Sequence, residues 1–399
     1  MERLIAKKRM TAAAFLLFLF IFAGFNLYTQ RIYLRDNIAA AIEEGSTLSG
    51  LITEIEDTVD ENILGRYYFI DAYGFFQKLL DKKEENNFEV VKDKQGKLHY
   101  TYFTETANDT SAFSKRVVNL RNAVSESGSQ VIYVMPLDKY IDGYTEYSIG
   151  IPYSMVNETA DQFLEELSDN GVDSIDLRDY IGDSGLDMSE VFYTTDHHWK
   201  IETAYWAANT FFSVLQSDYG EVIENEELYA DKDNYNIITY KNCFLGSQGR
   251  KTGRYYTSPD DFTLIYPKFT TNYELDSSIL DGMSLTGRFE EALLALPVLR
   301  ETATPYDTDL YMAYMYGNQA YAHIENMKNP DGLNICFIKD SFAVPFAVFS
   351  SLRCNNVYLI DPRYYEDNME DFINKNDIDY VIIMFSPENL ADDFFTFGK

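Results

Sequence analysis

Two short segments of the sequence hold residue types that can carry out nucleophilic catalysis. The first, residues 194–199, reads TTDHHW and places Asp196 two residues before His198, with His197 between them. The second reads FIKDSFAVP and contains Ser341. A serine nucleophile needs a histidine base, and that histidine needs a carboxylate to fix its tautomer. The two segments together supply the three residue types of a Ser-His-Asp triad.

Each segment also has a simpler interpretation. Ser341 follows an apolar run and opens a helix-like segment, where its hydroxyl can serve only as a helix cap. The same position brings backbone N–H groups close to it, and these can hold a developing oxyanion. The histidine pair can be structural, or can bind a metal ion, although two adjacent histidines rarely ligate one ion from a turn. We expect no metal, but the residue types alone leave these alternatives open.

Apolar runs that alternate with helix-like segments must position these residues. Short runs typical of buried strands are residues 130–136, 174–177, 333–339, 355–361 and 379–385. Helix-like segments are residues 117–124, 155–170 and 199–216, and the run AVPFAVFSSL after Ser341. This alternation predicts an α/β fold with a mostly parallel sheet and helices on both faces.

Ligands of such sheets bind at the carboxyl ends of the strands. Three polar features fall there: Asp340–Ser341, Asp361–Arg363 and the segment after Asp176. By contrast, residues from about 217 to 310 are polar, rich in Tyr, Asp and Thr, and contain short strand-like pieces such as FTLIYPKF. We interpret them as a β-rich insertion or subdomain.

The N-terminus predicts a membrane anchor. Residues 10–28 contain no charge, and about 20 apolar residues span a bilayer as a helix. The basic residues before this run are Arg3, Lys7, Lys8 and Arg9. The positive-inside rule then gives a cytoplasmic tail, residues 1–9, and an extracellular remainder. A cleaved signal peptide is the main alternative, but the run is long for one, and Ala23-Gly24-Phe25 is a poor cleavage site.

The exported part divides into a stalk and a large domain. Residues 29–63 show helical periodicity with many acids, which predicts a juxtamembrane helical stalk, broken at Gly45 and Gly50. Residues 64–399 form the α/β domain. We expect a cell-membrane protein with a single membrane pass.

Composition excludes some functions. The formal net charge is −31, which repels nucleic acid, and also anionic polymers unless the binding cleft is locally basic. Three cysteines are too few for a disulfide scaffold, and no CxxC motif is present. Cys336 and Cys354 lie in apolar runs and are predicted to be core residues.

The order TDHHW, then IKDSF, then LIDPRYY resembles the DHHW family of Gram-positive surface proteins. It is also similar to the SGNH-hydrolase-like alginate acetylation proteins of the AlgJ and AlgX type, in which a D-x-H-W segment precedes a G-D-S-F-like segment. The resemblance runs from about residue 60 to the C-terminus. It implies an SGNH-hydrolase-like domain with Ser341 as nucleophile, His198 as general base and Asp196 as its orienting acid. His197 fills the variable position.

The sequence departs from that pattern in two respects. Lys339 stands where a glycine often precedes Asp-Ser. The usual oxyanion residues are not obvious, and our candidates for this role are Gly246, Asn318 and Arg363. The Asp-His segment also precedes the serine, the reverse of ordinary SGNH esterases, but triads are defined by geometry and not by order.

The resemblance implies a membrane-anchored extracytoplasmic enzyme that transfers O-acyl groups, most simply acetyl, onto a cell-surface polysaccharide. No cofactor is expected. The expected partner is a membrane-bound O-acyltransferase that supplies acyl groups. The alternatives are a carbohydrate esterase, and a non-catalytic glycan-binding or assembly factor with a degenerate site.

Overall fold

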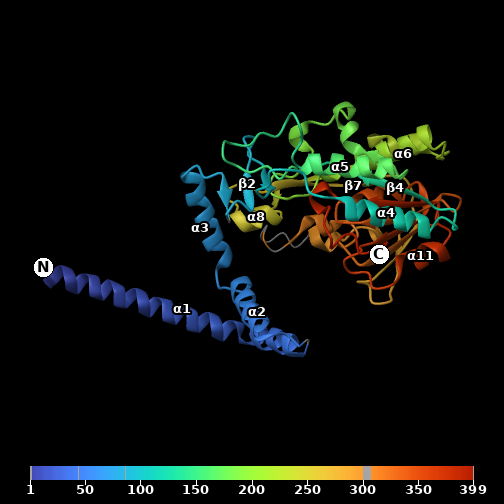
Figure 1. Ribbon diagram of the computed structural model, residues 1–399. Coiled ribbons are helices and arrows are strands. Elements are labelled where there is room, and N and C mark those ends of the chain that lie inside the picture. The colour runs from blue at the N-terminus through green and yellow to red at the C-terminus, as the bar shows by residue number, and fades with distance from the viewer. Residues whose placement is uncertain (1, 44, 86, 300–305, 307, 399) are drawn as a thin grey trace. The chain divides into compact units, whose positions relative to one another are not determined.

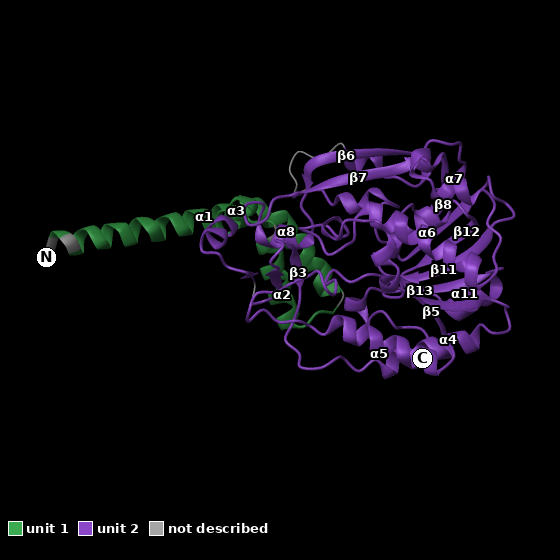
Figure 2. Cartoon of the chain, turned by 90° about the horizontal axis from the view of Figure 1, so that it is seen from above, with its two compact units in different colours: residues 1–73 green, residues 74–399 purple. Residues whose placement is uncertain are grey.

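The computed structural model describes residues 2–43, 45–85, 87–299, 306 and 308–398 (Figure 1). The chain divides into two compact units, Met1–Tyr73 and Gly74–Lys399, which Figure 2 shows in different colours.

The first unit begins with one long helix, α1 (Glu2–Glu43), which contains the whole uncharged run of residues 10–28. Among the described residues it is the one helix long and apolar enough to cross a membrane. The predicted continuous helix is confirmed, while length and composition alone do not distinguish an anchor from a signal sequence.

The chain reverses direction after α1. Gly45 adopts a left-handed φ of +78°, and the second helix, α2 (Leu48–Glu61), begins after the capping residue Thr47. A break is therefore present at Gly45. Gly50, the other expected break, lies inside the first turn of α2 and does not interrupt it. Its backbone N–H donates to the hydroxyl of the capping residue Thr47.

Helix α2 runs antiparallel to α1. The Asn37 side chain donates to the Thr58 hydroxyl at 3.0 Å, and the Gln30 side chain donates to the Asn62 carbonyl at 2.8 Å. The predicted stalk is thus a helical hairpin. A third helix, α3 (Arg66–Leu79), follows it.

The second unit contains an eight-stranded sheet with the order β5-β4-β13-β11-β12-β10-β8-β9. The five strands from β5 to β12 are parallel to their neighbours, and β10, β8 and β9 add an antiparallel edge. The strands are β4 (Gln130–Met135), β5 (Asp173–Asp176), β8 (Tyr273–Ser277), β9 (Leu285–Gly287), β10 (Tyr321–Asn326), β11 (Leu333–Lys339), β12 (Cys354–Ile360) and β13 (Tyr380–Met384). Each predicted strand corresponds to one of the parallel strands.

Helices cover both faces of this sheet (Figure 2). Alternate side chains of β4 and β11 enter two separate hydrophobic clusters, as the two-residue repeat of a strand requires. The helices of the first cluster are α6 (Ile201–Asp218) and α10 (Ala343–Ser350), and those of the second are α4 (Ser111–Ala123), α5 (Val156–Asp169) and α11 (Met369–Lys375). The α/β fold class is confirmed, and Cys336 and Cys354 are fully buried core residues.

Smaller elements complete the unit. The remaining strands form a three-stranded antiparallel sheet, β1 (Glu84–Glu85), β2 (Val90–Lys92) and β3 (Leu98–Tyr100), and a two-stranded one, β6 (Tyr235–Phe244) and β7 (Asp260–Pro267). The short helices are α7 (Glu226–Ala230), α8 (Ser247–Thr252) and α9 (Phe289–Ala292). The polar segment expected to form a β-rich insertion thus supplies the β6–β7 pair and also two strands, β8 and β9, of the main sheet.

Candidate active site

The serine lies where a central parallel strand ends. Strand β11 ends at Lys339, Asp340 and Ser341 follow, and α10 begins two residues later. The Asp340 carboxylate is fully buried and accepts the backbone N–H of Phe342 and that of Ser386, at 2.9 and 2.6 Å. It therefore ties the loop after β11 to the loop after the neighbouring strand β13, and this fixes the backbone that carries Ser341.

The histidine bridges the serine and the acid. Nε2 of His198 lies 2.7 Å from Oγ of Ser341, and Nδ1 lies 2.5 Å from Oδ1 of Asp196. Because a carboxylate can only accept, the proton of Nδ1 points to Asp196, and Nε2 is left to accept the serine hydroxyl. The alternative in which Ser341 is only a helix cap is not seen, since α10 has Phe342 at its N-cap and no side-chain cap.

The acid is held in its charged form. Asp196 is 1% exposed, and burial alone would raise the pKa of its carboxyl group. The neighbouring His198 and His197, together with hydrogen bonds from the His198 ring and the Ser247 backbone, hold this pKa well below its usual range. The Ser247 N–H reaches Oδ2 at 2.7 Å, so each carboxylate oxygen has a donor.

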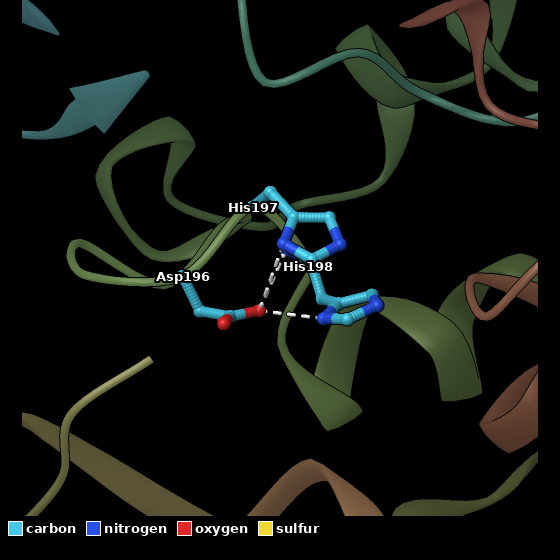
Figure 3. A group of neighbouring side chains, drawn as sticks. All are labelled: Asp196, His197 and His198. Atoms are coloured by element: carbon cyan, nitrogen blue, oxygen red, sulfur yellow. Dashed lines mark hydrogen bonds and ion pairs between the residues drawn. The ribbon is translucent and has the colours of Figure 1, made fainter. Parts of the chain in front are cut away.

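His197 takes no part in this relay. Its Nδ1 lies 2.9 Å from the Ser247 hydroxyl and 3.8 Å from Oδ1 of Asp196 (Figure 3). Asp196, His197 and His198 lie close enough together to be considered as metal ligands. However, both ring nitrogens of His198 already face Ser341 and Asp196, so this orientation suits proton transfer better than metal binding.

The turn that carries the acid is fixed from several sides. Asp260 accepts the backbone N–H groups of Thr194 and Thr195 at 2.7 and 2.8 Å. The buried ammonium of Lys139 donates to the Asp196 carbonyl at 2.7 Å and to the Gln248 side chain at 2.9 Å. Burial lowers the pKa of Lys139 to about 7.

Gly246 lies against the acid and not beside the serine. A Cβ atom there would come within 2.1 Å of the Asp196 Cβ, so only glycine fits. Its backbone N–H is donated to the Thr195 hydroxyl at 3.0 Å. We expected Gly246 to donate to an oxyanion, and the structure corrects this, because its N–H is already in use.

The other two oxyanion candidates belong to an ionic cluster around Asp361. The Asn318 amide donates to the Asp361 carboxylate at 2.6 Å, and Arg363 binds the same carboxylate at 2.9 and 2.7 Å. Lys339, the residue in place of the usual glycine, is 1% exposed and donates to the Asn318 side chain. Among the described residues, no hydrogen bond joins Asn318 or Arg363 to Ser341 or His198.

Sequence reasoning missed four residues that hold the relay: Lys139, Asp260, Ser247 and Tyr311. Lys139 follows the carboxyl end of β4, and that position was the available signal. Tyr311 stacks on the His198 ring, and Asp260 opens β7. Neither lies in a segment whose pattern indicated a function.

Comparison with known proteins agrees with this architecture. Residues 98–230, which include the Asp-His segment but not Ser341, match the family model of the SGNH hydrolase-like domain of the acetyltransferase AlgX. Bacillus cereus PatB1, solved with a sulfonyl adduct, has a TM-score of 0.60 and 18% identity over 78% of this chain and 97% of its own. No curated protein matches the chain significantly.

A DHHW family protein from Eubacterium siraeum has a TM-score of 0.56 and 18% identity over 76% of this chain and 92% of its own. At such identities the solved structures show a shared fold. The resemblance inferred from the sequence is confirmed: residues 98–230 match the family model of the SGNH hydrolase-like domain of the acetyltransferase AlgX, and the fold is shared with a DHHW family protein.

Proposed function

We propose that this protein is a membrane-anchored, extracytoplasmic Ser-His-Asp O-acyltransferase, acting with acetyl groups on a cell-surface polysaccharide. The observation that carries the proposal is the His198 ring, whose two nitrogens lie 2.7 Å from Ser341 and 2.5 Å from Asp196. A degenerate, non-catalytic site has no need of this relay, and the intact geometry therefore favours an enzyme.

In the first half-reaction the Ser341 oxygen attacks the carbonyl carbon of an acyl ester donor while Nε2 of His198 takes the hydroxyl proton. Asp196 remains ionised and stabilises the imidazolium that forms. The tetrahedral intermediate collapses, and the donor alcohol leaves with the proton from His198. The product is an acyl ester on Ser341.

In the second half-reaction a sugar hydroxyl attacks the acyl-serine, and His198 takes its proton and then returns it to the Ser341 oxygen. Water in place of the sugar gives hydrolysis, which is the esterase alternative. The developing oxyanion needs a donor close to the serine. Among the described residues, no acceptor binds the backbone N–H of Ser341, and we assign this group as one oxyanion donor.

A pocket beside the relay suits a sugar acceptor. It has a volume of about 240 Å³, and its lining includes Tyr100, Tyr102, Asn108 and Asn389. The Asn389 amide donates to Asp340 at 2.8 Å, one residue before the nucleophile, and the Tyr100 ring lies 6.0 Å from the ring of His197. Aromatic faces with amide groups between them are the surface that pyranose rings and their hydroxyls require.

The charge near the pocket is mixed. Lys251 lies 4.9 Å from the centre of the Tyr100 ring and is paired with Glu89, and the lining includes both Glu89 and Glu388. A neutral sugar therefore suits this pocket better than an anionic polymer.

The anchor gives the enzyme its location. We propose that residues 10–28 span the membrane, with residues 1–9 in the cytoplasm and the stalk and residues 64–399 on the extracytoplasmic side. A membrane-bound O-acyltransferase in the same bilayer would supply acyl groups at the outer surface. The resemblance to the AlgJ and AlgX type implies this partner, while chemistry requires only that an acyl donor reach the outer surface.

The proposal is tested by covalent labelling. A sulfonyl fluoride or fluorophosphonate should label Ser341, in line with the sulfonyl adduct of Bacillus cereus PatB1. His198→Gln should abolish labelling, while the same substitution one residue earlier, His197→Gln, should preserve it. Equal labelling of all three proteins, or labelling at another residue, would show that the relay does not activate Ser341.

Turnover then separates the two reactions. The purified chain is given a nitrophenyl acetate donor, with and without an oligosaccharide acceptor, and the acetylated sugar is measured by mass spectrometry. Acetylated sugar supports transfer. Release of acetate alone, unchanged by any acceptor, would assign the protein as an esterase.

A further inference from the structure

The chain that leaves the stalk hairpin is hydrogen-bonded to helix α1, within and just beyond the predicted membrane span. The Asn26 side-chain oxygen accepts the backbone N–H of Leu64 at 2.7 Å, and Gln30 donates to the carbonyl of Asn62. Asn26 and Gln30 are both buried, although they lie on a helix whose other residues are mostly exposed. These contacts fix where the chain leaves the hairpin: beside Asn26, inside residues 10–28.

A contact between two aromatic rings joins the same two segments at a position closer to the cytoplasmic end of the span. The rings of Phe22 and Phe69 have centroids 6.0 Å apart and meet edge to face. Phe22 precedes Tyr28, the outer end of the predicted span, by six residues. At 1.5 Å per residue it lies roughly 9 Å below that end. Whatever medium surrounds Phe22 therefore also reaches Phe69.

Residues 64–73, the returning segment, expose four large apolar or aromatic side chains. Leu64, Tyr68, Phe69 and Tyr73 are between 52% and 77% exposed. The backbone remains satisfied at this depth, since Tyr68 and Phe69 both donate their N–H groups to the Gly65 carbonyl. This satisfies the requirement that lipid imposes on a backbone.

We propose that residues 64–73 are seated in the outer interface of the lipid bilayer, so that the first unit enters the membrane twice: once through the spanning helix and again through this aromatic segment. Tyrosine rings at that level are typical of the aromatic belt of membrane interfaces. Arg66 is compatible with this position, because its long side chain can reach the headgroups and its guanidinium lies 5.9 Å from the centre of the Tyr67 ring.

The inference rests on the proposed membrane anchoring, because it places residues 64–73 relative to a span that must itself lie in lipid. It goes beyond that anchoring in a specific way. A simple stalk would carry the chain away from the surface, whereas the hairpin returns it to the bilayer before the second unit begins.

The test uses depth-dependent fluorescence quenching. The full chain with Cys243→Ser is reconstituted in phosphatidylcholine–phosphatidylglycerol vesicles, with Tyr68→Cys carrying an environment-sensitive nitrobenzoxadiazole label. Cys336 and Cys354 are fully buried and can stay. The matched control is Leu48→Cys, a 76% exposed position at the other end of α2. Helix α1 continues 15 residues beyond Tyr28, so this control lies about 20 Å outside the membrane.

We expect lipids with a nitroxide at acyl carbon 5 to quench the label at position 68 at least threefold more than the label at position 48. A nitroxide at carbon 12 should quench position 68 less than carbon 5 does. Equal, weak quenching at both positions in vesicles that carry the protein would overturn the inference and leave the anchor intact. Blue-shifted emission at position 68 without lipid quenching would mean that protein covers the segment, which also overturns it. Failure of the chain to float with vesicles would overturn both the anchoring and the inference.

Discussion

The phenol ring of Tyr311 lies flat against the imidazole ring of His198, with ring centroids 3.8 Å apart and planes 10° apart. An aromatic face in this position fixes the orientation of the imidazole. It also stabilises the positive charge that the imidazole acquires when Ser341 attacks. Tyr311 therefore acts on the reaction through His198.

Replacement of Tyr311 tests that role. Tyr311→Phe keeps the ring and should retain most of the activity, whereas Tyr311→Leu should lower kcat about fivefold, because the charged imidazole loses a stacking contact worth about 1 kcal/mol. The measurement is acetyl transfer from nitrophenyl acetate, with thermal unfolding recorded alongside. Equal activity in the Phe and Leu variants would show that the stacking is only packing.

Asp196→Asn tests the acid. The two carboxylate oxygens of Asp196 accept hydrogen bonds, one from the His198 ring and one from the Ser247 N–H. The asparagine amide replaces one of these acceptors by a donor, and a donor that faces the ring favours the wrong tautomer of His198. Activity should fall by roughly 10³- to 10⁴-fold, as in other triads. Because Asp196 is 1% exposed, we expect a lower melting temperature as well.

Ser341→Ala is the matched control for that experiment. It removes the nucleophile, leaves the hydrogen bonds of Asp196 in place, and should lose activity with a smaller change in melting temperature. Full activity of the Asn variant would remove Asp196 from the relay and leave it as a turn residue.

Gly246→Ala should inactivate the protein by a steric clash and not by a change of charge. The new methyl would lie 2.1 Å from the Asp196 Cβ and must displace the carboxylate from the His198 ring. We expect at least a 100-fold loss of kcat. Gly182→Ala is the control, because a methyl there meets nothing within 4 Å and should leave activity unchanged. Comparable activities of the two variants would show that the Asp196 turn moves without cost.

The buried Lys139 predicts a pH dependence of stability. Burial lowers its pKa to about 7, and an unfolded lysine titrates near 10.4. Between these values the unfolded chain holds more protons than the folded one. The contribution of this group to stability is therefore complete above the unfolded pKa and is lost as pH falls through about 7.

Lys139→Met removes this titration, because methionine carries no proton. The free energy of unfolding of the wild type, minus that of the variant, should rise as pH increases from 7 to 10. Other buried lysines, such as Lys339 with a pKa lowered to about 8, remain in both proteins and cancel in the difference. Urea titrations at intervals of one pH unit measure it. A difference that does not change with pH would show that Lys139 keeps its proton throughout.

The sequence predicted the relay because its signals are local. Asp196 and His198 are separated by one residue, and Ser341 follows a short, β-branched apolar run that is typical of a buried strand. Parallel strands bring their carboxyl ends to one edge, so the position of Ser341 at that edge was also predictable. The likeness of the two motifs to a known family added the roles of the three residues.

The residues that support the relay were not predictable in the same way. Asp260 and Tyr311 reach it from polar segments, where no periodicity indicates which side chains turn inward. Gly246 was singled out for its N–H, while its function is to leave room for Asp196. Asn318 and Arg363 are polar residues near strand ends, but the charge of Asp361 holds both. Sequence identifies polar residues at an edge, whereas only packing decides which partner each one binds.

Strand β13 lies between β4 and β11, so the last strand of the chain occupies the middle of the sheet. Ser386, just beyond it, is one of the groups that hold Asp340 next to the nucleophile. The pairing of β4 with β11 through β13, and the Ser386 hydrogen bond to Asp340, therefore depend on residues that follow every other strand of this sheet in the chain. The position of the nucleophile is thus linked to the segment of the second unit that is synthesised after the rest of the sheet.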